Sequence, residues 1–382
     1  MQFSRQTIYD DKSVPIAGQI FIQGTTEDMG EDQVDLFERF LQIIIEEVDK
    51  KIDKYKLIIP AEFYPYMAKM NKFITGKLSI KIDVASHNPT SLDLMEQISN
   101  DGYSLTVEIK DRKVISLLPE NTEYVIVEAG LMSLLEDELN FLKASYKCVA
   151  KDVDTRELFD ELKELDVAFF CGEFIEKSEG ISEDVISPNK TAVISLMNAL
   201  SDPDVELDVV TKMVISHTVL SYKILRVVNS AAYRGVREIT SVQEAIVRFG
   251  FNNLKKWVMM LSLCCLGDKP SALIKIALQR GVMCSKLAEH LKAGDTDSYY
   301  MAGMLSMIDA FLDKPIEKLL QDINISQDIQ QGILAGKGTI GQVLDIVKKY
   351  QQGDVSFKDP KLTSIFIDSA EETNEIMRTV GM

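Results

Sequence analysis

The chain has 382 residues, which is too long for one small hydrophobic core and favours two domains. Its 46% hydrophobic and 26% charged residues are typical of a globular protein. It carries 42 basic and 59 acidic residues, so its net charge is −17 and its field repels phosphate backbones. The charge therefore excludes nucleic acid as a default partner, and no run of Lys and Arg opposes that conclusion.

Strand-like runs and amphipathic helices alternate in the first half of the chain. Runs rich in Val, Ile, Leu, Tyr and Phe predict strands at 15–24, 55–60, 77–85, 103–109, 123–130, 146–153 and 167–174. Apolar periodicity predicts helices at 32–52, 91–102 and 155–165. Strands that alternate with helices indicate a largely parallel sheet or a β/α barrel.

The pattern changes after a polar stretch that contains Gly and Pro. This stretch predicts a linker at 179–190, which separates a first domain at 1–178 from a second domain at 191–382. Beyond the linker the sequence shows no convincing strand, so the second domain is predicted to be all-α. Near its end, four apolar residues predict a final helix that docks on the protein itself, with docking on a partner as the alternative: Ile365, Phe366, Ile376 and Met377.

Two helical signals are prominent in the second domain. Apolar residues between 209 and 229 form a helical stripe with His217 on its apolar face, which favours a hydrogen-bonded core histidine over a metal ligand. In the segment "ITSVQEAIVRFG", Ser241 and Glu244 have the spacing of a capping box, and Gly250 can end the helix.

The five cysteines indicate a reducing compartment. They show no CxxC spacing, and their odd number favours free thiols: Cys148, Cys171, Cys264, Cys265 and Cys284. The first residues lack a basic start followed by an apolar run, so no secretory signal is expected. Apolar runs such as "WVMMLSLCCLG" are too short for a membrane span. We therefore expect a cytoplasmic protein without a membrane partner.

The run "ILRVVNSAAYRGVREITSVQEAIVRFGFNNLKKWVMM" (224–260) joins a helix end at Asn-Ser to the capped helix that follows. The side chains of Asn229 and Ser230 can bond the backbone groups that a helix end frees. In its order of motifs the run resembles the signature of HDOD domains over roughly 185–310. These are helical modules related to HD-type metal phosphohydrolases. The signature positions, structural or interacting, are Asn229, Ser230, Tyr233, Ser241, Glu244 and Gly250.

The stretch from 301 to 354 resembles the tail of bacterial EAL–HDOD signalling proteins, and the first half then resembles a degenerate EAL domain. "SRQTIYDDKSVPIAGQIFIQG" is similar to the start of that domain, and "CVAKDVDTRELFDELKELDVAFFCGEF" is similar to its end. The resemblance implies a β/α barrel of the kind that hydrolyses cyclic di-GMP with metal-bound water. About 180 residues are few for such a barrel, which typically takes ~250, so abbreviated or absent βα units are expected.

The resemblance implies that the oxygen ligands of the two catalytic metal ions are mostly lost. Two hard divalent cations need a cluster of carboxylates and an amide. The positions that match the metal ligands and catalytic residues of EAL domains carry only some acidic residues here, and Lys81 intrudes in one strand. These positions are Gln19, Glu108, Glu128, Lys151, Asp154 and Cys171. Glu108, Glu128 and Asp154 can form an acidic remnant or can be solvated carboxylates at strand ends.

The helical domain lacks the corresponding chemistry of HD enzymes. Their His-Asp pair would fall on Ser306 and Met307, and Asp309 has no histidine partner. The three histidines of the chain show no metal-ligand spacing: His87, His217 and His290. No cofactor is therefore expected.

The sequence thus predicts α/β plus all-α architecture, an abbreviated EAL-like β/α barrel followed by an HDOD domain. The resemblance implies a non-catalytic bacterial signal-transduction protein that binds other signalling proteins in cyclic di-GMP-related regulation, such as motility or biofilm formation. The alternatives are a cyclic dinucleotide sensor that binds without cleaving and a residual cyclic di-GMP phosphodiesterase. Cyclic di-GMP binding and the oligomeric state stay open at this point.

Overall fold

The computed structural model describes most of the chain and divides it into two compact units. One unit comprises Met1–Ile175 and Lys349–Ser364, and the other comprises Glu176–Lys348 and Ile365–Met382. The described residues are 2–24, 31–47, 55–67, 77–82, 89–132, 135–178, 188–202, 205–229, 238–250, 258–259, 261–263, 265–266, 269–323, 325–357 and 359–380. The predicted positions Ser230, Tyr233 and His87, and most of the predicted linker, lie outside them.

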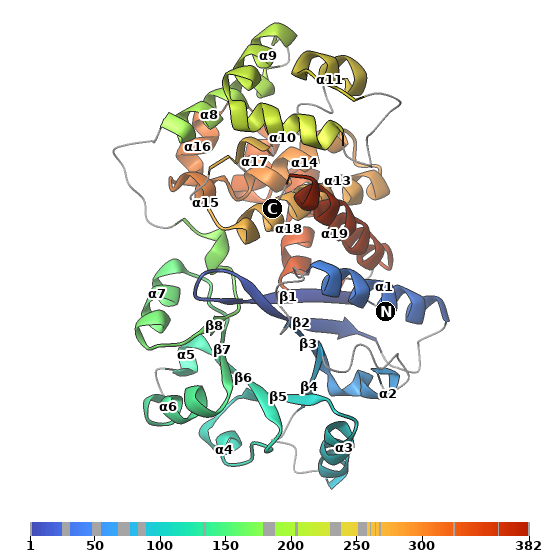
Figure 1. The fold of residues 1–382 in the computed structure, drawn as a ribbon, viewed down its shortest axis with the longest axis vertical. Helices are drawn as coiled ribbons and strands as arrows, with labels where there is room; N and C mark the ends of the chain where they lie inside the picture. Colours follow the sequence, from blue (N-terminus) through green and yellow to red (C-terminus); the bar gives the residue numbers. More distant parts are fainter. Residues whose placement is uncertain are drawn as a thin grey trace. The chain divides into compact units, whose positions relative to one another are not determined.

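Eight strands close into a barrel in the first unit, in chain order around the ring (Figure 1). They are β1 (Gln2–Asp10), β2 (Pro15–Gln23), β3 (Lys56–Pro60), β4 (Leu78–Ile82), β5 (Ser104–Ile109), β6 (Thr122–Glu128), β7 (Lys147–Lys151) and β8 (Phe169–Phe170). β1 runs antiparallel to both β2 and β8, and every other neighbouring pair is parallel. The predicted β/α barrel is confirmed, although β8 is shorter than the predicted strand at 167–174.

All eight strands of the barrel are present. The expected shortening of the βα units therefore lies in their helices. β1 and β2 are joined by a hairpin in which the Asp10 carboxylate accepts from the backbone N–H groups of Lys12 and Val14, at 2.9 and 2.8 Å. The remaining connections carry α1 (Glu31–Glu47), η2 (Ala61–Phe63), α2 (Tyr64–Met67), α3 (Pro89–Asn100), α4 (Arg112–Ile115), α5 (Ala129–Met132), α6 (Glu136–Ser145), α7 (Arg156–Glu164) and η5 (Phe174–Glu176). Shortening therefore falls on helices such as α4 and α5, which have four residues each.

The helix predicted at 155–165 is confirmed as α7. The Thr155 hydroxyl accepts from the N–H of Leu158 and caps its first turn. Phe159 is buried, and its ring stacks on that of Phe174 at 4.4 Å between centroids. Phe159 also packs against Phe170 of β8 at 4.6 Å between ring centroids, so these aromatic rings fix the last connection of the barrel against its closing strand.

The structure assigns 349–364 to the barrel unit, whereas we predicted a single helical domain over 191–382. Tyr350 is fully buried, and its hydroxyl donates to the carbonyl of Phe3 and bonds Thr363 at 2.9 Å. Thr363 also accepts from the N–H of Phe3, and the Gln2 amide donates to the carbonyl of Asp359 at 2.7 Å. Buried polar groups need such partners, so β1 holds this segment.

Every element described in the second unit is helical. The helices are α8 (Pro188–Ser201), α9 (Leu207–Ser216), α10 (Thr218–Val228), α11 (Val242–Phe249), α13 (Ser271–Leu291), α14 (Thr296–Leu305), α15 (Ile308–Leu312), α16 (Ile316–Asp322) and α17 (Gln327–Ala335), with most of α18 (Gly338–Gln351) and α19 (Lys361–Val380). Two of these helices, α13 and α14, cross closely. A Cβ on Gly303 of α14 would lie 2.7 Å from the Cα of Gly281 on α13, so only glycine fits this crossing.

The final helix docks on the protein, as predicted. Ile365, Phe366, Ile376 and Met377 of α19 are all buried. No helix in the described part of the chain combines the length and apolar character that a membrane span requires.

One helix prediction was wrong. The stripe at 209–229 is two helices, α9 and α10, which break at His217 with φ −101° and ψ 92°. The Ser216 hydroxyl donates to the carbonyl of Met213, and the Ser221 hydroxyl donates to that of Val214. These bonds satisfy carbonyl groups that the end of α9 frees, so the break is stable. His217 therefore lies between two helices rather than on the apolar face of one.

Candidate functional site

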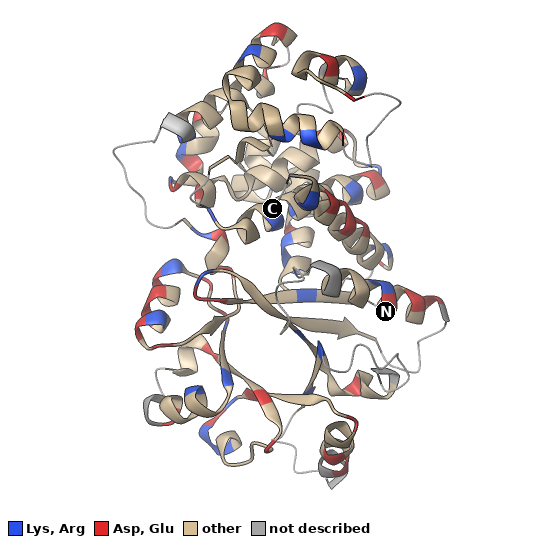
Figure 2. Cartoon of the chain, viewed as in Figure 1, with Lys and Arg blue, Asp and Glu red and all other residues tan. Residues whose placement is uncertain are grey.

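The barrel interior is apolar at its centre and charged at both ends. The central layer joins side chains from strands on opposite sides of the ring: Ile8, Ala17, Ile58, Tyr124, Ile126, Val149 and Cys171. Figure 2 shows basic and acidic segments on the strands around this ring. Chemistry in β/α barrels occurs at the carboxyl ends of the parallel strands, so that end is the candidate site.

Lys81, Glu108 and Lys151 form what we call the mouth triad, at the carboxyl ends of β4, β5 and β7. Lys81 Nζ lies 2.6 Å from Glu108 Oε2, and Lys151 Nζ lies 3.1 Å from Glu108 Oε1. β6 separates β5 from β7 in the ring, so the pair of Glu108 with Lys151 crosses the inside of the barrel. All three side chains are roughly three-quarters buried or more, which strengthens their mutual attraction relative to water.

The two lysines keep Glu108 ionised. Burial alone raises the pKa of Glu108, but hydrogen bonds and charges from Lys81 and Lys151 outweigh it and hold that pKa below its ordinary value. Burial likewise lowers the pKa of Lys151, and Glu108 outweighs it, so the pKa of Lys151 is raised. The mouth triad is thus a carboxylate between two ammonium groups.

A cavity of about 560 Å³ opens at the same end of the barrel, lined in part by Lys81 and Glu108. Gln19 of β2 also lines it and is only 4% exposed. Phe21, Glu62 and Lys110 add an aromatic ring and one charge of each sign to its wall. The lining therefore mixes charged and polar side chains with apolar ones, and it contains three positions already named from the sequence: Gln19, Lys81 and Glu108.

The other predicted positions do not join the mouth triad into an acidic cluster. Glu128 is exposed at the end of β6, beside Lys151 in the strand register. Asp154 is exposed and accepts from the N–H of Glu173 at 3.3 Å. Cys171 is buried in the central apolar layer, and burial raises its pKa to about 12. The carboxylates of Glu108, Glu128 and Asp154 therefore lie in different environments.

The mouth does not fit a pair of divalent cations. Such ions need several oxygen ligands each, and their charge must not face other cations at bonding distance. Glu108 is the carboxylate of the mouth triad, and both of its oxygens already accept from lysines. Among the described residues, no three His, Cys, Asp or Glu side chains lie together as a metal site would require.

A second triad at the opposite end of the barrel was missed by the sequence analysis. Lys56, Glu123 and Lys147, the base triad, lie at the amino ends of β3, β6 and β7. The Glu123 carboxylate pairs with Lys56 at 3.1 Å and with Lys147 at 2.7 Å. Burial raises the pKa of Glu123, but hydrogen bonds from Lys147, Ser104 and Lys56 hold it below its ordinary value. The available signal was a lysine at the second position of two strand-like runs, 55–60 and 146–153.

Asn229 holds the turn after α10, as the sequence analysis anticipated. Its amide donates to the carbonyls of Leu225 and Ile239 at 2.9 and 2.8 Å, and its oxygen accepts from the N–H of Ile239. The side chain thereby replaces helix bonds that end here and fixes the start of the next helix.

The capping box of α11 also forms. The Ser241 hydroxyl accepts from the N–H of Glu244 at 3.1 Å, while the Glu244 carboxylate accepts from the N–H of Thr240. Gly250 has φ +78°, which favours glycine at the helix end.

The positions of the HD pair carry a buried arginine network instead of metal ligands. The Ser306 hydroxyl donates to the carbonyl of Gly303 and accepts from Arg280 at 3.4 Å. Arg280 is 1% exposed and forms an ion pair with Glu176 at 2.7 Å. Burial raises the pKa of Asp309 nearby. A guanidinium in this place repels a divalent cation.

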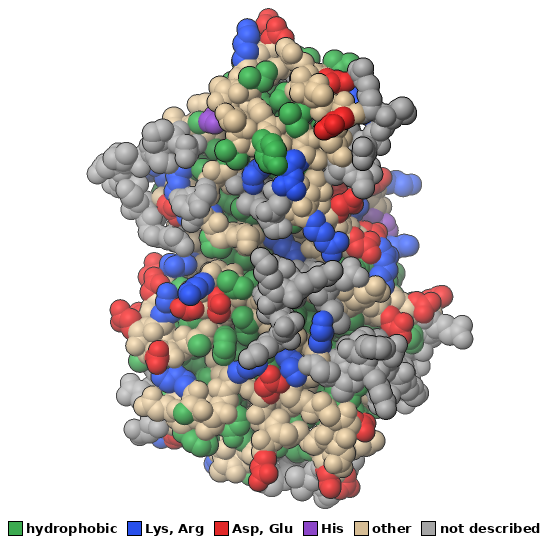
Figure 3. Space-filling model, viewed as in Figure 1, with side chains coloured by type: hydrophobic (Ala, Val, Ile, Leu, Met, Phe, Trp, Pro, Cys, Tyr) green, Lys and Arg blue, Asp and Glu red, His purple; other side chains and the backbone are tan. Residues whose placement is uncertain are grey.

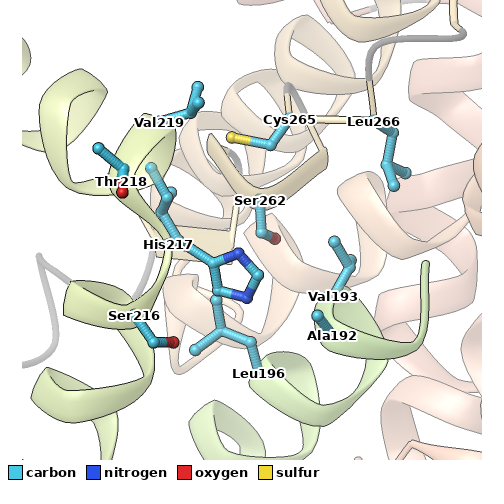
Figure 4. A pocket seen from close by; sticks show the side chains of 11 residues that line it. Ala192, Val193, Leu196, Ser216, His217, Thr218, Val219, Ser262, Cys265 and Leu266 are labelled. Carbon is cyan, nitrogen blue, oxygen red and sulfur yellow. The ribbon is translucent and has the colours of Figure 1, made fainter. Parts of the chain in front are cut away.

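His217 lines a pocket of about 320 Å³ (Figure 4). Its imidazole points into the pocket, with Leu196 of α8 and Ser262 beside it. Cys265 and Val219 complete the opposite wall. The pocket is thus built where α9 breaks and α10 begins.

Comparison with known families identifies most of the second unit. Residues 187–323 match the family described as the HDOD domain. This region is an HDOD domain. The resemblance drawn from 224–260 is confirmed, and Asn229, Ser241 and Glu244 lie within the matched part.

Relatives of the HDOD-containing chain include two curated bacterial proteins. It is 28% identical over 259 residues to the uncharacterized protein YuxH of Bacillus subtilis, covering 65% of this chain and 62% of that protein. It is 28% identical over 273 residues to the cyclic di-GMP phosphodiesterase CdgJ of Vibrio cholerae, covering 69% of this chain and 62% of that protein. The chain thus spans less than two thirds of the length of both relatives.

Solved structures similar to this chain include the EAL enzyme Bd1971 with cAMP and cyclic di-GMP bound. The sequence identity is 10% and the TM-score is 0.32, over 45% of this chain and 60% of that chain.

Proposed function

We propose that this chain is a non-catalytic signal-transduction protein of cyclic di-GMP-related regulation, which acts by binding other signalling proteins. The mouth triad carries the proposal. Two lysine ammonium groups lie at bonding distance from Glu108 at the end of the barrel where chemistry would occur. A two-metal hydrolase needs carboxylates there to hold its cations.

The comparisons support the cyclic di-GMP context of the proposal. One relative, at 28% identity, is the cyclic di-GMP phosphodiesterase CdgJ, and the HDOD domain accompanies a barrel in this chain. The cytoplasm belongs to the same proposal, because all four described cysteines are free thiols, as a reducing compartment favours.

Incubation of the purified chain with cyclic di-GMP and Mg²⁺ or Mn²⁺ tests the absence of catalysis. Chromatography should show no linear dinucleotide above a control without metal. Turnover that Glu108→Gln or Glu128→Gln abolishes would refute the proposal and establish a residual phosphodiesterase with a rearranged acidic cluster.

Binding without cleavage is a second candidate function, favoured by the cavity of about 560 Å³ at the mouth. Its lining includes Lys81, Lys110 and the buried amide of Gln19, which can contact phosphate and base groups. Calorimetry with cyclic di-GMP in EDTA separates the two functions. A sensor would bind without metal and lose affinity in Lys81→Glu, while an interaction protein would release no heat.

A further inference from the structure

The surface of α10 in the HDOD domain differs in charge from the rest of the chain. Between Asp208 and Glu238 the sequence contains no acidic residue, although 59 of the 382 residues are acidic. The same stretch contains five basic residues: Lys212, Lys223, Arg226, Arg234 and Arg237. A chain of net charge −17 thus presents one locally basic segment, of which α10 is the described core.

Apolar side chains share the exposed face of α10 with these cations. Val219 is 58% exposed and Tyr222 is 61% exposed. Val219, Tyr222 and Arg226 follow one another at three and four residues, so they form a stripe about 10 Å long on one side of the helix. The guanidinium of Arg226 lies over the Tyr222 ring at 5.9 Å from its centre. Figure 3 shows hydrophobic side chains beside basic ones in the region of α10.

The stripe leads into the pocket at His217. Val219 is both exposed and part of the pocket lining. Lys223 lies close enough to Cys265 in the pocket wall for its charge to act on that thiol. A volume of about 320 Å³ accepts one bulky side chain, and Val193, Leu196 and Leu266 give it apolar walls. Stripe and pocket therefore form one continuous surface.

We infer that this surface docks an acidic amphipathic helix of a partner protein. An i, i+3, i+7 stripe matches a second helix lying along α10, and one apolar side chain of that helix fills the pocket. Carboxylates of the partner helix on either side of this apolar side chain would face Lys223 and Arg226. The imidazole of His217 points into the pocket (Figure 4). The inference rests on the proposed function and names the class of partner that the HDOD domain receives.

The charge of the whole chain selects against two other occupants. An anionic membrane is an extended surface that faces the whole chain of net charge −17, whereas a helix contacts only α10 and the pocket; a membrane also has no group that fills a pocket of defined size. A second copy carries acidic residues in abundance, yet its overall charge opposes association with itself. A partner helix with clustered carboxylates matches apolar stripe, pocket and cations together.

Two labelled 18-residue peptides test the inference on the full chain. Both carry the same Leu and Phe pattern at helical spacing, and the flanking positions are all Glu in one and all Lys in the other. Fluorescence anisotropy should show the acidic peptide binding at least tenfold tighter, with an affinity that falls as salt rises. Tyr222→Ala and Arg226→Glu should each weaken binding at least tenfold. Phe141→Ala, which removes an exposed aromatic of α6, is the matched control.

Equal affinity of the two peptides, or binding unchanged in Arg226→Glu, would overturn the inference. Phosphatidylglycerol vesicles that bind the chain, but not Arg226→Glu, would reassign the surface to membranes if the acidic peptide does not bind. Sedimentation showing a dimer that Tyr222→Asp dissociates would reassign it to a second copy. A chain that hydrolyses cyclic di-GMP and still binds the acidic peptide would refute the proposed function and leave this inference standing.

Discussion

The two ends of the barrel carry the same three charges. The base triad of Lys56, Glu123 and Lys147 repeats the mouth triad, with one glutamate between two lysines and a lowered glutamate pKa in each. In β/α barrels the amino end of the strands serves stability and the carboxyl end serves chemistry. The base triad therefore shows what such an arrangement does where no reaction is expected, namely close the end of an apolar core with paired charges.

The difference between the ends lies in what surrounds each glutamate. At the base, Lys56 also donates to Ser104 at 3.4 Å, and Lys147 lies over the Tyr124 ring, which belongs to the apolar layer. At the mouth, Lys81 and Glu108 line a cavity of about 560 Å³. The mouth thus combines the same arrangement of charges with an open cavity.

Reversing both lysines at one end should have the largest effect. Lys81→Glu with Lys151→Glu leaves three carboxylates together and should lower the free energy of unfolding by about 3–5 kcal/mol, measured by urea unfolding with circular dichroism. Mg²⁺ should restore part of the loss, because clustered carboxylate oxygens are its ligands and the cavity admits a hydrated ion.

The matched variant Lys56→Glu with Lys147→Glu should lose similar stability without rescue by Mg²⁺. Equal rescue at both ends would mean that the cavity gives the mouth no special access to ions. No rescue at either end would show that carboxylates placed at the mouth do not bind Mg²⁺.

Removing the glutamates one at a time should have the next largest effect. Glu108→Gln and Glu123→Gln each leave two facing ammonium groups, so each should cost about 1–3 kcal/mol of unfolding free energy. Because the apolar layer separates the ends, the double variant should show the sum to within about 0.5 kcal/mol. A large coupling energy would show that the two ends act as one network.

Acid should weaken both ends together. Glu108 and Glu123 have lowered pKa values in the folded chain. Their contribution to the free energy of unfolding is therefore complete above the pKa of a glutamate in the unfolded chain, about 4.3. It is lost as pH falls through the lower folded values. Unfolding in urea between pH 6 and pH 3 should therefore show a smaller loss for the Glu108→Gln, Glu123→Gln double variant than for the natural chain. Parallel curves would contradict the shared lowering.

The sequence predicted the strands of the barrel better than its ends. Runs of β-branched residues locate β3 to β7 within a few residues, because each strand depends on local composition. Lys81 and Lys151 were recognised as departures from the EAL pattern, but their convergence on Glu108 depends on barrel closure and strand register. The base triad escaped notice for the same reason, since Lys56 and Glu123 lie 67 positions apart.

Long-range and backbone features elsewhere in the chain were equally hidden. The apolar periodicity continues through His217, so it gave no sign of the break that creates the pocket. The hydrogen bonds of Tyr350 to Phe3 and Thr363 join the two ends of the sequence, which no local pattern reports. The capping box at Ser241 and the turn residue Asn229 were predictable, because their partners lie within ten residues.

The smallest expected effect concerns the exposed edge of the mouth. Asp152 pairs with Lys151 at 3.6 Å and has φ +60°, a left-handed conformation that Asn tolerates. Asp152→Asn should therefore remove only an exposed ion pair and cost at most about 0.5 kcal/mol of unfolding free energy. Asp152→Ala should cost about 1 kcal/mol more, because it adds backbone strain. If Asp152→Asn instead costs as much as Glu108→Gln, the mouth is a four-residue network with no counterpart among the contacts of the base triad, and the likeness of the two ends fails.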